Sequence, residues 1–142
     1  MLKRLSCLAL ALTACSGAAP PPAVTLEIAL ASPVSLPASG RADVPVTLTL
    51  RNGSAAPVTL TGSNECVTHT WTVTDAAGQD VDGRTICPMI YMPRTHVLAP
   101  GEWRSNAVLT LDAGKYAAGG HYALHYRFWG VSADAAFSIE KH

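Results

Sequence analysis

The sequence predicts an all-β fold, an antiparallel β-sandwich, on three observations. The chain has 142 residues, which suffice for one domain with its own core and are too few for two ordinary domains. Short runs rich in β-branched and apolar residues alternate with threonines and charged residues. Clusters of Gly, Pro, Asn and Asp divide these runs at a spacing of about ten residues, which is typical of sandwiches.

The clearest predicted strand covers residues 44–51. Val46, Leu48 and Leu50 share one of its faces, and threonines occupy the other. Pro45 stands near the predicted start, where a missing N–H is tolerated. An Asn-Gly-Ser turn ends the strand. The other predicted strands are residues 24–31, 57–61, 69–75, 95–98, 102–111, 121–129 and 135–140.

Alternation along these strands also predicts the core, because a sandwich buries the inner faces of two sheets. In the strand at 69–75, Trp71 and Val73 point inward and the threonines point outward, so Trp71 is interpreted as a packing residue. The predicted core comprises Leu48, Leu50, Leu60, Trp71, Val73, Leu109, Leu111, Tyr122, Leu124, Tyr126 and Phe137.

Residues 1–14 are typical of an export signal. Lys3 and Arg4 precede a short apolar run at 5–12, well below the about 20 residues that span a bilayer. The run ends in Leu-Thr-Ala-Cys, which resembles a bacterial lipobox and implies that Cys15 becomes the lipidated first residue. The alternative is an ordinary secretory signal with Cys15 incidental. Both interpretations predict an extracytoplasmic protein.

The lipobox interpretation predicts a lipoprotein of the cell envelope, held by acyl chains rather than by a helix. Ser16 follows Cys15, which favours the outer membrane if the cell has one. Residues 15–23 are small and Pro-rich and would form a short extended tether, so residues 24–142 form the predicted domain.

The charge balance excludes a nucleic-acid binder, because ten basic and ten acidic residues give a net charge of zero. Cys66 and Cys87 are the cysteines that follow Cys15, and outside the cytoplasm such a pair predicts a disulfide. The bond would stabilise the fold by about 3 kcal/mol in the chain-entropy model. A metal-binding or redox pair is the alternative.

Several segments within residues 43–128 together resemble the Bacillus intracellular proteinase inhibitor family. They are the strand ending at 48–52 and the segments 57–60, 71–78, 98–103 and 119–124. The resemblance implies an immunoglobulin-like sandwich of seven to eight strands and a protein partner, with a proteinase as one candidate. It carries no inhibitory residue onto a position of this chain.

The sequence contains none of the common catalytic motifs. There is no Gly-x-Ser-x-Gly elbow and no phosphate loop, so we expect a protein that is not an enzyme. Asp75, Asp80 and Asp82 lack the twelve-residue calcium pattern with its terminal Glu and are interpreted as a solvated turn. His121 and His125 are too far apart along a strand to share a metal.

The segment at 87–96 is the candidate binding loop, because an apolar run lies between two prolines beside the predicted disulfide. Its candidate contact residues are Met89, Ile90, Tyr91, Met92 and Arg94. The plainer interpretation is that Ile90 and Tyr91 cover one end of the sandwich. Residues 126–130 have the same two interpretations, edge packing or a contact surface.

The leading hypothesis is therefore a membrane-anchored, non-catalytic protein-binding lipoprotein without a cofactor. The alternative is a periplasmic copper-binding module, because thioether and imidazole groups suit copper. Its ligands would be Met89, Met92 and His96, with His69 as a further candidate.

Overall fold

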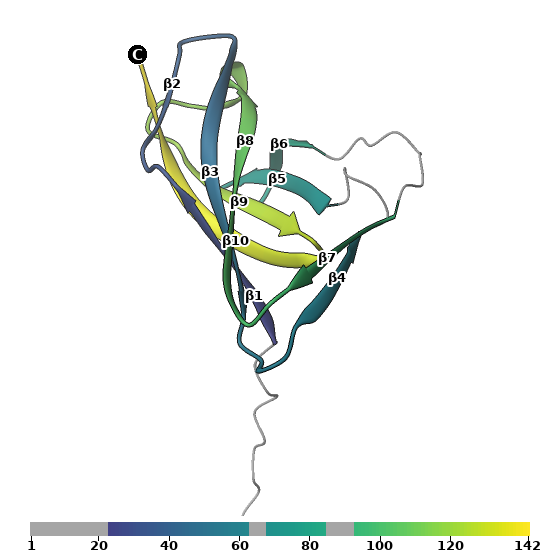
Figure 1. Ribbon diagram of the computed structural model, residues 1–142. Helices are drawn as coiled ribbons and strands as arrows, with labels where there is room; N and C mark the ends of the chain where they lie inside the picture. Colours follow the sequence, from purple (N-terminus) through teal and green to yellow (C-terminus); the bar gives the residue numbers. More distant parts are fainter. Residues whose placement is uncertain (1–22, 63–67, 85–92) are drawn as a thin grey trace, which may run out of the picture.

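The computed structural model describes residues 23–62, 68–84 and 93–142, with strands throughout (Figure 1). It confirms the predicted all-β sandwich. No helix among the described residues is long and apolar enough to span a membrane. The strands are β1 (Val24–Leu30), β2 (Val34–Leu36), β3 (Arg41–Asn52), β4 (Val58–Gly62), β5 (His69–Asp75), β6 (Asp80–Arg84), β7 (Arg94–Leu98), β8 (Gly101–Asp112), β9 (His121–Phe128) and β10 (Val131–Lys141).

The strands form two main layers and a small ribbon. One layer has the order β1-β3-β8, the other β2-β10-β9-β5-β6, and β4 pairs with β7. In Figure 1, β3 and β8 run lengthwise and β9 and β10 run obliquely to them. Ten strands are described instead of seven to eight, because the short strands β2 and β6 join the edges of the second sheet. β2 runs parallel to β10, whereas the other pairs are antiparallel.

Pro45 lies inside β3, which begins at Arg41, rather than near the start of the strand. The N–H of Gly53 bonds to the Ala23 carbonyl on the β1 side, so odd residues of β3 face β1. The missing N–H of Pro45 therefore points toward residue 31, just beyond the end of β1 at Leu30. A proline is tolerated in this central strand because its neighbour has already ended.

The core forms between the two layers as the alternation predicts. Every residue of the predicted core is buried, from Leu48 at 0% exposed to Tyr122 at 9%. The structure adds further buried apolar residues, which are Val34, Leu36, Val44, Val46, Leu98, Ala113, Tyr116, Phe128 and Ile139. Phe128 belongs to the core, so the packing interpretation of the 126–130 segment is confirmed for this residue.

Two turns depend on buried or capping side chains. Asn52 ends β3 and is buried, with its amide donating to the carbonyls of Ala56 (2.9 Å) and Leu98 (3.1 Å). Its Oδ1 accepts from the N–H of Ser54 at 3.0 Å. Asp75 closes the turn after β5, because its Oδ1 accepts the N–H groups of Ala77 and Gln79 at 2.9 Å. The predicted turns are thus fixed by side-chain to backbone bonds.

Candidate functional site

Much of the predicted binding loop lies outside the described residues. This holds for Met89, Ile90, Tyr91 and Met92, and equally for Cys15, Cys66 and Cys87. Arg94 and His96 lie on β7, so the predicted loop ends in a strand.

The described residues that flank the two later cysteines are neighbours. Gly62 and Arg94 are Cα partners in the β4–β7 ribbon, and Trp71 and Arg84 are partners in the β5–β6 pair. A disulfide between Cys66 and Cys87 would thus join two segments whose flanks already adjoin. The disulfide itself stays a prediction.

An aromatic stack, which we define as Trp129, His96, Trp103, Phe128 and His69, lies where β7 begins. The His96 ring lies 4.2 Å from the Trp103 ring and 5.7 Å from the Trp129 ring, as centroid distances. Trp103 is stacked on Phe128 at 5.4 Å, and Phe128 lies 4.5 Å from His69. The stack therefore joins β7, β8, β9, β5 and the β9–β10 turn. Its member on β7, His96, follows the 87–93 segment by three residues.

Trp129 occupies an unusual backbone conformation in this stack. Its φ is 50°, followed by 80° at Gly130, in the two-residue turn between the paired residues Phe128 and Val131. A hairpin turn with positive φ at both positions normally takes Asn, Asp or Gly. A bulky residue there is strained by about 1–2 kcal/mol. The surrounding contacts hold the Trp129 ring beside His96 despite this strain.

The two histidines of the copper hypothesis differ in their surroundings. His69 Nδ1 lies 3.0 Å from the Tyr126 hydroxyl, so a neighbour in the protein already engages that nitrogen. The His96 ring makes no hydrogen bond to another described residue and is flanked by two indoles. No group of three or more His, Cys, Asp or Glu side chains is placed to hold a metal within residues 23–62, 68–84 and 93–142.

A Thr-His-Asp relay lies on the outer face of the larger sheet. His125 Nδ1 lies 2.8 Å from Asp134 Oδ1, and His125 Nε2 lies 3.0 Å from Thr74 Oγ1. The spacing is that of a hydroxyl nucleophile, base and orienting carboxylate. However, β5 is paired on both edges, so its backbone N–H groups point along the sheet to β6 and β9 and not toward a substrate above Thr74. Thr74 and Asp134 therefore engage both ring nitrogens of His125 and fix its orientation.

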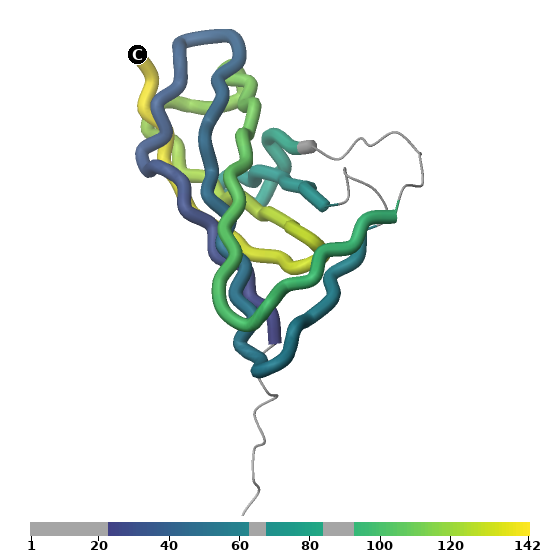
Figure 2. The backbone as a smooth tube through the Cα atoms, in the orientation of Figure 1, coloured from purple at the N-terminus to yellow at the C-terminus, as the bar shows by residue number. Residues whose placement is uncertain are grey.

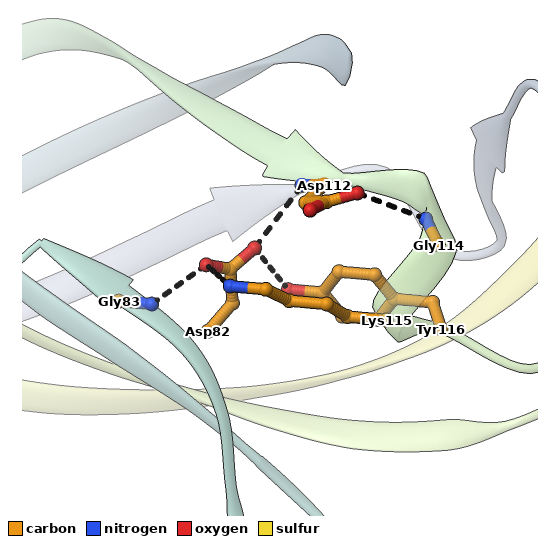
Figure 3. A network of polar contacts seen from close by, with 6 residues as sticks. All are labelled: Asp82, Gly83, Asp112, Gly114, Lys115 and Tyr116. Atoms are coloured by element: carbon orange, nitrogen blue, oxygen red, sulfur yellow. Dashed lines mark hydrogen bonds and ion pairs between the residues drawn. The ribbon is translucent and has the colours of Figure 1, made fainter. Parts of the chain in front are cut away.

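The prediction of a solvated turn is wrong for Asp82. It lies on β6 with its side chain only 9% exposed. Its Oδ2 accepts the N–H of Asp112 (3.1 Å) and the hydroxyl of Tyr116 (3.4 Å). Its Oδ1 accepts the N–H of Gly83 and the Lys115 ammonium, both at 3.0 Å (Figure 3). Asp82 therefore ties the edge of the larger sheet to the end of β8.

The electrostatics of this network follow from its hydrogen bonds. Burial alone would raise the pKa of Asp82, but the Asp112 N–H, the Lys115 ammonium and the Gly83 N–H together hold that pKa below its usual value. Burial, followed by the negative charge of Asp82, raises the pKa of Tyr116. Tyr116 is thus a neutral donor to a charged Asp82.

A polar pocket of about 420 Å³ adjoins this network between β8 and β6. Its lining comprises Arg41, Trp71, Asp82, Gly83, Val108, Thr110, Asp112 and Lys115. Arg41 is exposed, and its guanidinium makes no hydrogen bond or ion pair with another described residue. By contrast, Lys115 is paired with Asp82.

Sequence reasoning missed the aromatic stack and the Asp82 network for different reasons. Trp103 has the same alternation as Leu109 and Leu111 on β8, so extending that pattern backwards would have placed it inward. Trp129 carries no such signal, because it stands at a turn position that disfavours it. Asp82 and Asp112 are 30 residues apart, and no local pattern brings them together.

Comparisons with known proteins identify no family. No protein-family model and no curated protein matches the chain. A β-glucosidase from Listeria innocua is similar over 82% of this chain and 16% of its own, at 10% identity and a TM-score of 0.42. A β-glucosidase from Erythrobacter marinus is 12% identical over 80% of this chain and 15% of its own, with a TM-score of 0.36. Target SoR45 of the Northeast Structural Genomics Consortium is 17% identical over 81% of this chain and 80% of its own, with a TM-score of 0.37.

Proposed function

We propose that this chain is a lipid-anchored extracytoplasmic protein whose immunoglobulin-like sandwich binds another protein and performs no catalysis. The observation that carries the proposal is the aromatic stack on β7, the strand that directly follows the 87–93 segment. Five rings from separate elements hold the start of β7, so the apolar residues that precede it are joined to a fixed base. A fixed base lowers the entropy lost when a segment is ordered on binding.

The chemistry of the segment favours a protein partner. Met89, Ile90, Tyr91 and Met92 supply adaptable and aromatic contact area, and Arg94 adds a charge at the edge. The resemblance to the proteinase inhibitor family makes a proteinase the first partner class to test.

The partner experiment measures inhibition of a panel of serine, cysteine and metalloproteinases by the full chain, purified in detergent. The test variant replaces Ile90 and Tyr91 by Ser together. Its matched control is Val97→Ser, which removes an apolar side chain that is 63% exposed on β7 itself. We expect loss of inhibition of at least about tenfold in the test variant and none in the control. Equal inhibition by both variants, or none by the wild-type chain, would refute the proteinase partner.

The anchor has a separate test in Cys15→Ser. If Cys15 carries the lipid, metabolic labelling with a fatty-acid analogue labels the wild-type chain and not the variant. The variant also leaves the membrane fraction or accumulates unprocessed. Labelling that persists in Cys15→Ser contradicts a lipid on this residue.

The second candidate function is copper binding, favoured by the position of His96. Its ring is free of hydrogen bonds to the described residues and lies between Trp103 and Trp129 at the end of the segment that contains both methionines. A copper titration of the full chain, under reducing and oxidising conditions, separates the two functions. Tight stoichiometric binding that is lost when Met89 and Met92 are both replaced by Leu would make metal handling the function. No binding excludes it.

A further inference from the structure

Over most of its length, the outer edge of β8 is not paired with any strand in residues 23–62, 68–84 and 93–142. The pairing of β8 with β3 runs unbroken from Arg41 opposite Asp112 to Asn52 opposite Gly101. The N–H of Ala113 bonds to the Gly40 carbonyl on the β3 side, whereas the N–H of Asp112 bonds to Asp82 on the other side. Odd residues of β8 therefore face β3, and even residues turn both N–H and C=O outward.

The even residues before Asp112 have no strand to pair with in the described part of the chain. They are Glu102, Arg104, Asn106, Val108 and Thr110. All five are exposed, and Val108 is 60% exposed. Such a row of unpaired donors and acceptors is a template for a further strand.

The edge of the second sheet, across from β8, is blunted by comparison. β6 has five residues, a register shift in its pairing with β5, and two aspartates. Short length, a bulge and charges are the devices that keep a sheet edge from pairing. Between residues 105 and 110, β8 contains no charged residue, no proline and no irregularity in its register. Of these two facing edges, β6 carries such devices, whereas β8 has no paired strand on this side among the described residues.

The pocket beside this edge indicates what the added strand carries. It lies against Val108 and Thr110, and Arg41 contributes a guanidinium without an ion-pair partner among the described residues. Lys115 is neutralised by Asp82, and Asp112 Oδ1 accepts the Gly114 N–H at 3.1 Å. The charged residues of the lining balance, and Asp112 is the Cα partner of Arg41. The Arg41 guanidinium, which has no ion-pair partner among the described residues, can still hold an incoming carboxylate through two parallel hydrogen bonds.

We propose that the outer edge of β8 receives an extended peptide segment of a partner protein. The backbone of that segment pairs with residues 102–110, and one of its acidic side chains enters the pocket at Arg41. Main-chain bonds supply affinity in this mode of recognition, and the pocket supplies specificity. The inference rests on the proposed function as a protein-binding domain, and it places the contact on a different surface from the 87–96 segment.

The test uses random dodecapeptides displayed on phage, selected against the immobilised full chain in detergent. Val108→Pro removes an N–H that points away from β3, so it blocks the added strand and spares the β3–β8 pairing. Val108→Thr is its matched control, because it keeps the N–H. Arg41→Gln tests the pocket, with Arg41→Lys as the charge-preserving control.

We expect enriched peptides to contain an Asp or Glu and to bind Val108→Pro and Arg41→Gln each about tenfold more weakly than the wild-type chain. The Thr and Lys controls should bind nearly as well as the wild type. Amide hydrogen exchange gives an independent readout, because a bound peptide should slow exchange at Arg104, Asn106 and Val108 and leave the already bonded Ala107 unchanged.

Four results overturn the inference. One is the absence of enriched peptides, and another is binding that neither Val108→Pro nor Arg41→Gln weakens while these amides exchange as before. The third is a dimer of the chain itself that Val108→Pro dissolves, which assigns the edge to a second copy. If Ile90→Ser with Tyr91→Ser abolishes partner binding while the edge variants do not, the edge inference fails and the proposed function stands.

Discussion

The two sides of the sandwich are completed in different ways. On one side β1 packs beside β10, and Figure 2 shows the purple and yellow strands running together. On the other side β8 faces β6 across the pocket of about 420 Å³. The first side is closed by apolar residues of β1 that point into the core, whereas the second is joined through a carboxylate. Burial of apolar surface is enough to hold the two sheets together on the first side. On the second side, the Asp82 carboxylate and the Asp112 N–H are hydrogen-bonded to each other, which offsets the cost of burying these polar groups.

On the open side, β8 is held at both ends, and its middle pairs with no other described strand on the outer edge. At one end Asp82 binds the backbone of Asp112, and at the other Trp103 is stacked between His96 and Phe128. These two anchors keep the strand in place, so its middle can expose backbone groups without fraying.

The largest effect is expected at Leu48, which is fully buried between a closed-side and an open-side neighbour. Its Cα partners are Ile28 on β1 and Ser105 on β8. Leu48→Ala should cost about 3–4 kcal/mol of unfolding free energy because it leaves a cavity. Ile28→Ala should cost about 2 kcal/mol and Ser105→Ala less than about 0.5 kcal/mol. Urea denaturation measures all three, and equal losses at Ile28 and Ser105 would contradict the difference between the sides.

The next effect separates the two edges of β8 itself. Ala107→Pro removes an N–H that faces β3 and leaves a carbonyl of that strand unpaired, so it should cost about 2–3 kcal/mol. Val108→Pro removes an outward N–H and should change stability by less than about 1 kcal/mol. Thermal unfolding compares the two variants. A larger loss at Val108 than at Ala107 would show that the outward edge is already engaged.

The polar anchor should produce a smaller effect that depends on pH. Because the pKa of Asp82 is lowered in the folded protein, its contribution is present above about pH 4 and is lost as the pH falls through the folded pKa. Asp82→Asn should cost about 1–2 kcal/mol at neutral pH, and less at acid pH. Asp80→Asn on the same strand is the matched control, since Asp80 is exposed and lies outside the network. Melting curves from pH 7 to pH 3 test this, and a constant difference between wild type and Asp82→Asn would exclude a charged anchor.

The same contrast separates the features that the sequence predicts from those that it does not. Alternation is a local property, so the inward residues of β3 and β5 were predicted correctly from their own segments. β2 has three residues, too few to show a period, and β6 contains Asp and Gly residues that disfavour strands. β6 forms because β5 offers it a partner, and Asp82 is buried because a distant turn supplies Lys115 and Tyr116. Contacts of this kind depend on topology, which no local pattern contains.

The smallest effect concerns the aromatic anchor, at Trp129. Trp129→Ala and Trp129→Gly both remove the ring that lies against His96, but only Ala keeps a Cβ at a φ of 50°. Gly should therefore be more stable than Ala by about 1 kcal/mol, whatever the stack contributes. The difference between wild type and Gly then reports the ring contacts minus the strain. If thermal unfolding places Gly at or above the wild type, the strain exceeds what the ring contacts return to folding, and the aromatic anchor does not stabilise the protein through Trp129.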